Sequence, residues 1–268
     1  MVIGPTGTGV HVDDAIGEWH EGTGPSPDTV EGRARDARAG NLAGRAIERA
    51  VALARSGAVQ GIVTAPIDKA ALLAGGYDFP GHTEMLERLT GSPTVMMLAG
   101  PKLRVVLATT HIALREVHAA LTQELIVRTA RITREGLRRA FGIREPRLAL
   151  CALNPHAGDH GRFGREDDDL LAPAARAAGI AGPFPADTVF VRAMRGEFDA
   201  VIAPYHDVGM TAIKVASFGE GVNVTLGLPF VRTSPDHGTA LDIAGKGVAS
   251  EQSFVAAVSC AVGMLARA

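Results

Sequence analysis

Short apolar runs alternate with longer helical patterns along most of this chain, and that alternation constrains the fold more than any other feature. The apolar runs predict strands at residues 59–65, 94–98, 103–108, 147–153 and 201–203. Helices are predicted to begin near residues 28, 66, 85, 125 and 253. Strands that alternate with helices form a parallel sheet with helices on its faces. We therefore expect an α/β fold with a mainly parallel sheet.

The first thirty residues do not follow this alternation. They are rich in Gly, Pro, Thr and Asp, and they predict at most one short strand followed by a loop. Residues 4–9 are Gly-rich, but no Gly-Lys-Ser/Thr follows them, so a Walker-type nucleotide site is excluded. The next helix is expected to begin at an Asp28 cap.

Composition excludes several classes of partner. The 268 residues carry a net charge of −2, which gives no electrostatic basis for binding nucleic acid or an anionic membrane. No apolar run is long enough to cross a bilayer, and the N-terminal residues lack a signal-peptide pattern, so we expect a cytoplasmic protein. Cys151 and Cys260 lie in apolar runs and are predicted to be buried free thiols.

Three histidines each follow a predicted strand: His111, His156 and His206. The carboxyl ends of parallel strands meet at one edge of a sheet, where α/β proteins bind their ligands. Neutral imidazoles are good ligands for divalent metals, and three of them leave coordination positions open for a substrate. Their long spacing matches no metal motif by itself, so structural roles for these histidines remain open.

A second group of polar residues has the composition of a site for phosphate or carboxylate. It comprises His82, Thr83, Lys214, Asn223 and Arg232. Arginine offers a bidentate fork and lysine a point charge, while asparagine and threonine supply neutral donors. The alternative is that the two basic residues are ordinary surface cations.

Seven segments carry a family resemblance, and they occur in that family's order. They are TAPIDK (64–69), GHTE (81–84), TTHIAL (109–114), NPHAG (154–158), YHDVGM (205–210), GVNVTLGLPFVRTS (221–234) and DHGTALDIAGKG (236–247). Together they resemble the 4-hydroxythreonine-4-phosphate dehydrogenase family of vitamin B6 biosynthesis.

The resemblance implies roles for both groups of residues. In that family three histidines, which correspond to His111, His156 and His206, bind a divalent metal such as Zn, Mg or Co. The metal lies in an active site shared between the two subunits of a homodimer. The family's substrate-binding residues correspond to the second group of polar residues, His82, Thr83, Lys214, Asn223 and Arg232, and all of them are present.

The last of the seven segments also resembles the nucleotide-binding turn of isopropylmalate and isocitrate dehydrogenases. That similarity implies a two-lobed α/β/α fold with an active-site cleft, and NAD as the cofactor. The residues that would bind NAD are His237, Gly238, Thr239, Ala240 and Asp242. In those enzymes the histidine packs on adenine and the aspartate contacts the ribose.

Two lobes are therefore expected. Residues 1–80 plus 225–268 would form the first lobe, on the nucleotide side, and residues 81–224 the second, on the metal and dimer side. The family normally opens with a strand and a GDPAGIGPE-like loop, which residues 1–27 do not resemble, so the first lobe is expected to be N-terminally incomplete.

The implied reaction is an NAD- and metal-dependent oxidative decarboxylation in pyridoxal phosphate biosynthesis. The C3 hydroxyl of 4-phosphohydroxy-L-threonine would be oxidised to a β-keto acid, which loses CO2 to give 3-amino-2-oxopropyl phosphate. The residues do not identify the general base, for which Lys214 and Asp207 are the candidates.

Three alternatives remain open from the sequence. A related enzyme could act on a phosphorylated sugar acid or a dihydrodiol carboxylate, because two residues depart from the family pattern. Asp68 stands where the family usually has Asn or His, and Val208 stands where it usually has Gln. A phosphotransacetylase-like acyltransferase would need no metal. An inactive paralogue would only dimerise or bind ligand.

Overall fold

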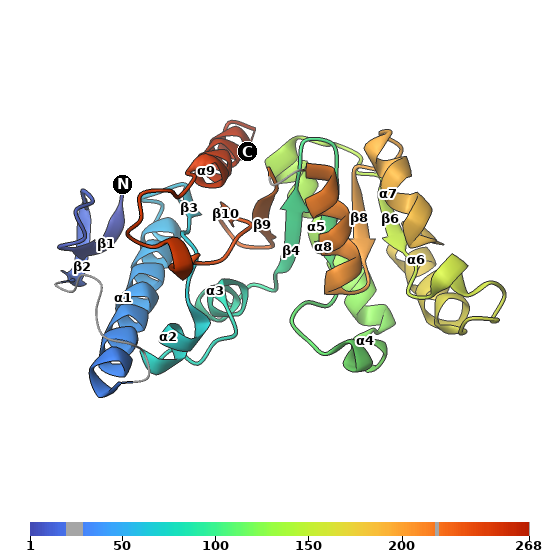
Figure 1. Ribbon diagram of the computed structural model, residues 1–268. Coiled ribbons are helices and arrows are strands. Elements are labelled where there is room, and N and C mark those ends of the chain that lie inside the picture. The colour runs from blue at the N-terminus through green and yellow to red at the C-terminus, as the bar shows by residue number, and fades with distance from the viewer. Residues whose placement is uncertain (20–28, 218–219, 268) are drawn as a thin grey trace. The chain divides into compact units, whose positions relative to one another are not determined.

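The computed structural model describes residues 1–19, 29–217 and 220–267 (Figure 1). The chain forms two compact units. The first comprises Met1–Ser92, Leu228–Phe230 and His237–Glu251; the second comprises Pro93–Gly227, Val231–Asp236 and Gln252–Ala268. The predicted lobe boundaries differ from these units, because they assign residues 225–227, 231–236 and 252–268 to the first lobe and 81–92 to the second.

The first unit begins with two strands, β1 (Ile3–Thr6) and β2 (Asp14–Glu18), which pair in parallel. The prediction of at most one strand in this region was therefore wrong. Each strand is only four or five residues long, and the glycines in and between the two strands break up their sequence pattern. Helix α1 (Val30–Arg55) begins at Thr29, whose hydroxyl accepts a hydrogen bond from the Gly32 amide at 3.0 Å. The predicted Asp28 cap lies outside the described residues.

Strand β3 (Gly61–Val63) leads to α2 (Lys69–Ala74), and α3 (His82–Thr90) follows.

Glycines in α1 let this helix approach α2 closely. A Cβ at Gly40 of α1 would lie 1.7 Å from the Ala71 carbonyl oxygen, and one at Gly44 would lie 2.1 Å from the Tyr77 ring. Only residues without a side chain fit at these two positions.

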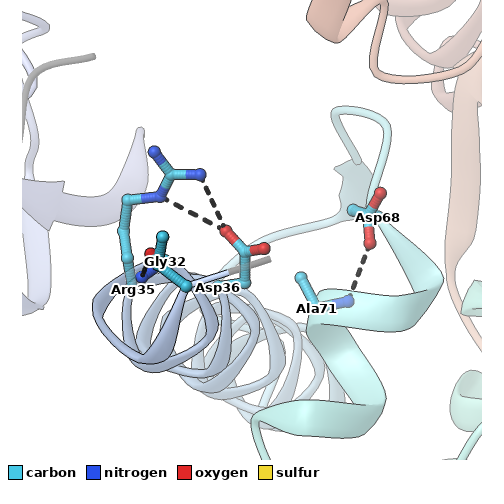
Figure 2. Close-up of polar contacts among 6 residues, drawn as sticks. Gly32, Arg35, Asp36, Asp68 and Ala71 are labelled. Atoms are coloured by element: carbon cyan, nitrogen blue, oxygen red, sulfur yellow. Dashed lines mark hydrogen bonds and ion pairs between the residues drawn. The ribbon is translucent and has the colours of Figure 1, made fainter. Parts of the chain in front are cut away.

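Asp68 has a structural role at the start of α2. Its Oδ1 accepts a hydrogen bond from the Ala71 amide at 2.7 Å and so caps the helix (Figure 2). Asparagine caps helices as well as aspartate does. The capping role therefore accounts for a short acceptor side chain at this position without a change of substrate.

The second unit is built on a mixed sheet. Its strands are β4 (Val95–Ala99), β5 (Arg104–Leu107), β6 (Leu148–Cys151), β7 (Ala181–Phe184), β8 (Ala200–Ala203), β9 (Val222–Leu226) and β10 (Val231–Pro235). Within this unit they lie in the order β10-β9-β4-β5-β8-β6-β7. The α/β class is confirmed. The sheet is less parallel than predicted, since β5, β8, β6 and β7 pair in parallel but β10, β9, β4 and β5 pair antiparallel.

Helices connect and cover these strands. They are α4 (Leu114–Ala120), α5 (Gln123–Phe141), α6 (Ala172–Ala178), α7 (Ala186–Met194), α8 (His206–Ser217) and α9 (Gln252–Leu265). Short turns of other helix types lie at Pro155–Gly158, Asp167–Leu171 and Leu241–Ile243. The Thr122 hydroxyl accepts from the Leu125 amide at 3.1 Å, which confirms the predicted cap of α5.

The two faces of the sheet carry different helices. On one face, Val105 and Val201 pack in a buried cluster with Phe190 of α7 and Ile213 of α8. On the other, α9 is joined to β10, where the Thr233 hydroxyl donates to the Ala257 carbonyl oxygen at 2.8 Å. Full burial of each such aliphatic side chain contributes about 1.5–3 kcal/mol. The sheet therefore holds α8, and the residues at its start, in a fixed position.

Both cysteines were predicted to be buried free thiols. Cys151 is a buried free thiol, as predicted, and its burial raises its pKa to about 12; Cys260 is free but only half-buried. Val208 is half-buried against the cluster under α8. No helix within the described ranges is long and apolar enough to cross a bilayer.

Candidate active site in the second unit

Three histidine-bearing segments follow strands that are neighbours in the sheet. Leu107 of β5 pairs with Ala203 of β8, and Leu150 of β6 pairs with Ile202 of β8, all in parallel. Adjacent strands lie about 4.8 Å apart. The carboxyl ends of β5, β8 and β6 therefore meet at one edge, and the chain continues from them to His111, His206 and His156.

Two of these histidines are brought together. The ring centroids of His111 and His206 lie 5.8 Å apart, with the rings tilted by 44°. His206 is the first residue of α8, and its Nδ1 lies 3.3 Å from Oδ1 of Asp207. When Nδ1 carries the proton it donates to this carboxylate and leaves Nε2 available as a ligand atom, which is the usual arrangement of metal-binding histidines.

A buried hydrogen bond ties the two loops to each other. The Thr109 hydroxyl, directly after β5, donates to the Pro204 carbonyl oxygen, directly after β8, at 2.8 Å. The Ala108 amide donates to the Ala203 carbonyl oxygen at 2.9 Å one step earlier. The spacing of the His111 and His206 loops is therefore set by the ends of the strands that carry them.

Thr109→Val should weaken this connection without changing side-chain volume. The Pro204 carbonyl oxygen would lose its buried donor, which costs about 1–3 kcal/mol. In a chain of this size that lowers Tm by roughly 2–4 °C per kcal/mol. Thr188→Val is the matched control, because the exposed Thr188 hydroxyl makes the same type of bond to the Pro185 carbonyl oxygen, at 3.1 Å. Equal Tm values for the two variants, measured by calorimetry, would contradict the proposed connection.

His156 lies in the tight turn after β6 and has a different neighbour. Its backbone has a φ of 54°, and its ring centroid lies 6.2 Å from that of Phe163. In the described part of the chain, no group of three or more His, Cys, Asp or Glu side chains has an arrangement that could hold a metal ion. The three-histidine metal site thus stays a prediction, with two of its members in contact.

Two of the residues predicted to bind phosphate or carboxylate, Asn223 and Arg232, lie on one face of β9 and β10. Asn223 is directly opposite Ser234 in the antiparallel pair, and Arg232 bonds to Thr225, so the four share a face. Arg232 is only 2% exposed, and its Nη1 donates to the Thr225 hydroxyl at 2.9 Å. Burial lowers the pKa of its guanidinium to about 10, which leaves it cationic at neutral pH.

Lys214 and the side-chain oxygen of Asn223 add a cation and a buried acceptor to this polar face. Lys214 of α8 lies with its Nζ 3.4 Å from the Asp236 carbonyl oxygen and 3.7 Å from the Asp236 carboxylate. The side-chain oxygen of Asn223 is buried and has no hydrogen-bond partner within the described residues. A buried acceptor of this kind normally receives a donor from a ligand or water. We call Lys214, Asn223, Thr225, Arg232 and Ser234 the polar strip.

Two members of the polar strip were missed by the sequence analysis. Thr225 and Ser234 are 3% and 5% exposed, and both are ordinary strand residues by composition. Side chains two residues apart on a strand share a face. Counting two residues on from Asn223 and Arg232 would have found them.

The remaining predicted residues belong to the first unit. His82 and Thr83 are the first two residues of α3, which begins earlier than the predicted Met85, and both are half-buried. Backbone amides in the first turn of a helix lack partners within the helix, so anions bind there. The anion role of His82 and Thr83 stays a prediction.

The predicted NAD-binding residues form an exposed turn of the first unit. The His237 Nδ1 lies 2.9 Å from the Gly238 carbonyl oxygen, and Ala240 has a φ of 49°. Asp242 lies in the short helix that follows and is exposed. The geometry is that of a tight turn with accessible side chains.

Comparison with known proteins shows which proteins this chain is similar to. Residues 24–261 match the family described as "Pyridoxal phosphate biosynthetic protein PdxA". The chain is 51% identical over 235 residues to the 4-hydroxythreonine-4-phosphate dehydrogenase of Caulobacter vibrioides, which covers 83% of this chain and 71% of that protein. It is 52% identical over 227 residues to the D-threonate 4-phosphate dehydrogenase of Cupriavidus necator, which covers 82% and 68%. The structure of a Klebsiella pneumoniae 4-hydroxythreonine-4-phosphate dehydrogenase is similar, with 45% identity and a TM-score of 0.78, over 85% of this chain and 71% of that chain.

Proposed function

Because the chain belongs to the PdxA family of pyridoxal phosphate biosynthetic proteins, we propose that it is a 4-hydroxythreonine-4-phosphate dehydrogenase. The observation that carries the proposal is the position of α8. Its first residue, His206, is in contact with His111, and its Lys214 belongs to the polar strip. One helix thus connects a group suited to metal chemistry with a group suited to a phosphate.

The proposed reaction has two steps. A hydride leaves C3 of 4-phosphohydroxy-L-threonine for NAD, and the C3 hydroxyl proton is released, which gives a β-keto acid. Loss of CO2 and uptake of a proton then give 3-amino-2-oxopropyl phosphate. Hydride transfer depends on the position of the C–H bond, so the side chains that hold the phosphate also determine the rate.

Arg232 and Lys214 are the proposed phosphate-binding residues in this unit, with His82 and Thr83 as further candidates. Arg232 carries five N–H donors in a rigid fork and has a permanent charge at neutral pH. The buried oxygen of Asn223 is suited to accept a hydrogen bond from the substrate ammonium or hydroxyl group. The polar strip therefore fits a small anion that also carries donors.

The histidine pair fits a divalent metal such as Zn, Mg or Co. His111 and His206 are in contact, and Asp207 faces Nδ1 of His206, so this ring presents Nε2. We assign the third ligand to His156, whose segment leaves the neighbouring strand. When bound, a divalent metal would lower the pKa of the substrate hydroxyl and stabilise the negative charge that develops during decarboxylation.

The general base is assigned to Lys214 or Asp207. The contact between Asp207 and His206 favours an orienting role for this carboxylate. Lys214 is then the better candidate, because its Nζ belongs to the polar strip and an unprotonated amine can accept the hydroxyl proton. In that role Lys214 would face the C3 hydroxyl and leave the phosphate charge to Arg232, so its two proposed roles are alternatives.

NAD, the subunit arrangement and the location of the enzyme complete the proposal. The NAD-binding residues are assigned to the exposed turn with His237, Gly238, Thr239, Ala240 and Asp242. The chain is proposed to act as a cytoplasmic homodimer with an active site shared between subunits, as the family resemblance implies.

A substrate panel tests the proposal. Purified protein with NAD and added Zn, Mg or Co should produce NADH with 4-phosphohydroxy-L-threonine, at a kcat/KM at least about tenfold above that for other hydroxy acids, which corresponds to about 1.4 kcal/mol. D-threonate 4-phosphate is the necessary comparison, since the relative from Cupriavidus necator, 52% identical to this chain, is named for that substrate. A higher kcat/KM for D-threonate 4-phosphate or for a dihydrodiol carboxylate would replace the proposed substrate. Acyl transfer that survives chelation would indicate the acyltransferase class, and binding without turnover an inactive paralogue.

A further inference from the structure

The turn that carries His156 has an unusual backbone. Four non-glycine residues in it have positive φ: His156 (54°), Ala157 (55°), Asp159 (44°) and His160 (55°). This region favours glycine, and residues with a side chain adopt it only when the surrounding structure holds them there. Some contact outside the turn must therefore stabilise it.

Asp167 supplies that contact. Its carboxylate is 1% exposed, and its two oxygens accept hydrogen bonds from successive backbone amides, Oδ1 from Leu153 at 2.8 Å and Oδ2 from Asn154 at 3.0 Å. These amides directly precede Pro155 and His156. A buried carboxylate that accepts two backbone bonds holds its segment firmly, because losing either bond leaves a buried group without a partner.

A second bond holds the same segment from the residue next to Asp167. The side-chain amide of Asn154 donates to Oε2 of Glu166 at 2.8 Å. The bond to Asn154 Nδ2 lowers the pKa of Glu166, after the larger effect of a backbone hydrogen bond. Gly164 passes close to both groups, since a Cβ there would lie 2.8 Å from Nδ2 of Asn154. The turn is thus held at its beginning by Asp167 and Glu166 together.

We propose that Asp167 is the positioning residue for His156: its buried carboxylate holds the strained turn so that the imidazole stays at the shared edge of β5, β8 and β6. The inference rests on the proposed function for its effect on the reaction. Its structural part, the position of the His156 ring, can be tested without substrate or metal.

Asp167→Asn is the test, with Asp168→Asn as the matched control, because Asp168 is exposed and adjacent. Asparagine keeps the shape but replaces one acceptor oxygen with a donor, which opposes a backbone amide. We expect the ring NMR signals of His156, assigned by comparison with His156→Ala, to shift in Asp167→Asn and to stay in place in Asp168→Asn. The amides of Leu153 and Asn154 should exchange with solvent about tenfold faster, while those of α5 keep their rates.

The effect on metal binding and turnover should follow. We expect the affinity for Co or Zn, measured by titration of the protein alone, to fall about 10- to 100-fold, as for other residues that orient a ligand. The kcat should fall by a similar factor and KM should stay within about threefold, since the polar strip is unchanged. Asn154→Ala, which removes only the bond to Glu166, should give a smaller change in the same direction. If Asp167→Asn fails to fold, Asp167→Glu, which keeps both acceptor oxygens at a longer reach, provides the test with the same readouts.

Unchanged His156 signals in Asp167→Asn, or in Asp167→Glu where that variant replaces it, would overturn the inference. Equal metal affinity in the Asp167 and Asp168 variants would also overturn it, provided that the wild-type protein binds the metal. A failure of the proposed function looks different. In that case the wild-type protein shows no turnover with the phosphothreonine substrate, while the His156 ring and the two amides still respond to Asp167→Asn.

Discussion

His206→Asn is expected to lower kcat/KM about 1,000-fold with 4-phosphohydroxy-L-threonine and NAD. A bound metal supplies several kcal/mol of stabilisation to such a reaction, and about 4 kcal/mol corresponds to this factor. The ring of His206 contacts His111 and faces Asp207, so its loss removes one of the two imidazoles that the structure brings together. The fold should survive, because the His206 side chain is 35% exposed and outside the sheet core.

Metal content separates this cause from a general loss of structure. We expect His206→Asn to lose bound Zn or Co after gel filtration while its Tm without metal stays close to that of the wild type. His11→Asn is the control, because His11 lies in the first unit with a side chain 82% exposed, and its Nε2 is 3.1 Å from the Asp13 carboxylate. Surface pairs of this kind contribute about 0–1 kcal/mol. A His206 variant with normal metal content and normal kcat/KM would rule out this histidine as a ligand.

Arg232→Met should lower kcat/KM at least 100-fold while changing the free energy of unfolding by less than about 1.5 kcal/mol. Charge-assisted hydrogen bonds contribute about 1.5–3 kcal/mol each, and a bidentate contact to phosphate combines two. The folded state, by contrast, carries the cost of burying the guanidinium, which is visible in its pKa of about 10. Replacing a buried charge by an apolar side chain of similar volume is often neutral for stability.

The loss should appear in substrate affinity and should not be rescued by lysine. An ammonium is more strongly hydrated in water than a guanidinium, so it is harder to bury, and a buried lysine readily loses its proton. Arg232→Lys should therefore also be impaired. Arg104→Met is the matched control, because Arg104 is a half-buried sheet residue on β5 whose guanidinium lies 5.0 Å from the Phe141 ring centroid, outside the polar strip. If Arg232→Met lost activity only in proportion to unfolding, measured by denaturant titration and kinetics on the same sample, Arg232 would be a structural residue.

The alternation of strands and helices was enough to predict the α/β class and the strand ends that carry histidines. The predicted strands at 103–108, 147–153 and 201–203 became β5, β6 and β8; the first two have slightly shorter bounds, and β8 begins one residue earlier than predicted. These are buried strands whose apolar runs are unambiguous. Once they are parallel neighbours, the segments that follow them must share one edge.

The pairing of β4, β9 and β10 could not be predicted in the same way. Antiparallel and parallel strands have similar composition, and the direction of β9 and β10 is set by their partners in the sheet. Counting two residues along each strand from Asn223 and Arg232 gives Thr225 and Ser234, but only the register of the pair shows that all four share one face.

The positive φ values around His156 were equally beyond the sequence. Nothing in the run Asn-Pro-His-Ala-Gly indicates that His156 and Ala157 adopt a conformation typical of glycine. The stabilising carboxylate, Asp167, lies more than ten residues further on and reads locally as part of an acidic helix start. Long-range hydrogen bonds of this kind become visible only in the folded structure.

Four residues of the polar strip stand on β9 and β10, whereas the three histidines come directly after strand ends, and this division bears on how substrate preference can diverge. The names of the relatives from Caulobacter and Cupriavidus share a 4-phosphate and differ in the acid that bears it. Rigid strands suit the recognition of a common phosphate, and loops tolerate change without loss of the sheet. A search for variants with a new preferred acid should therefore mutate the loops at the strand ends and leave β9 and β10 intact.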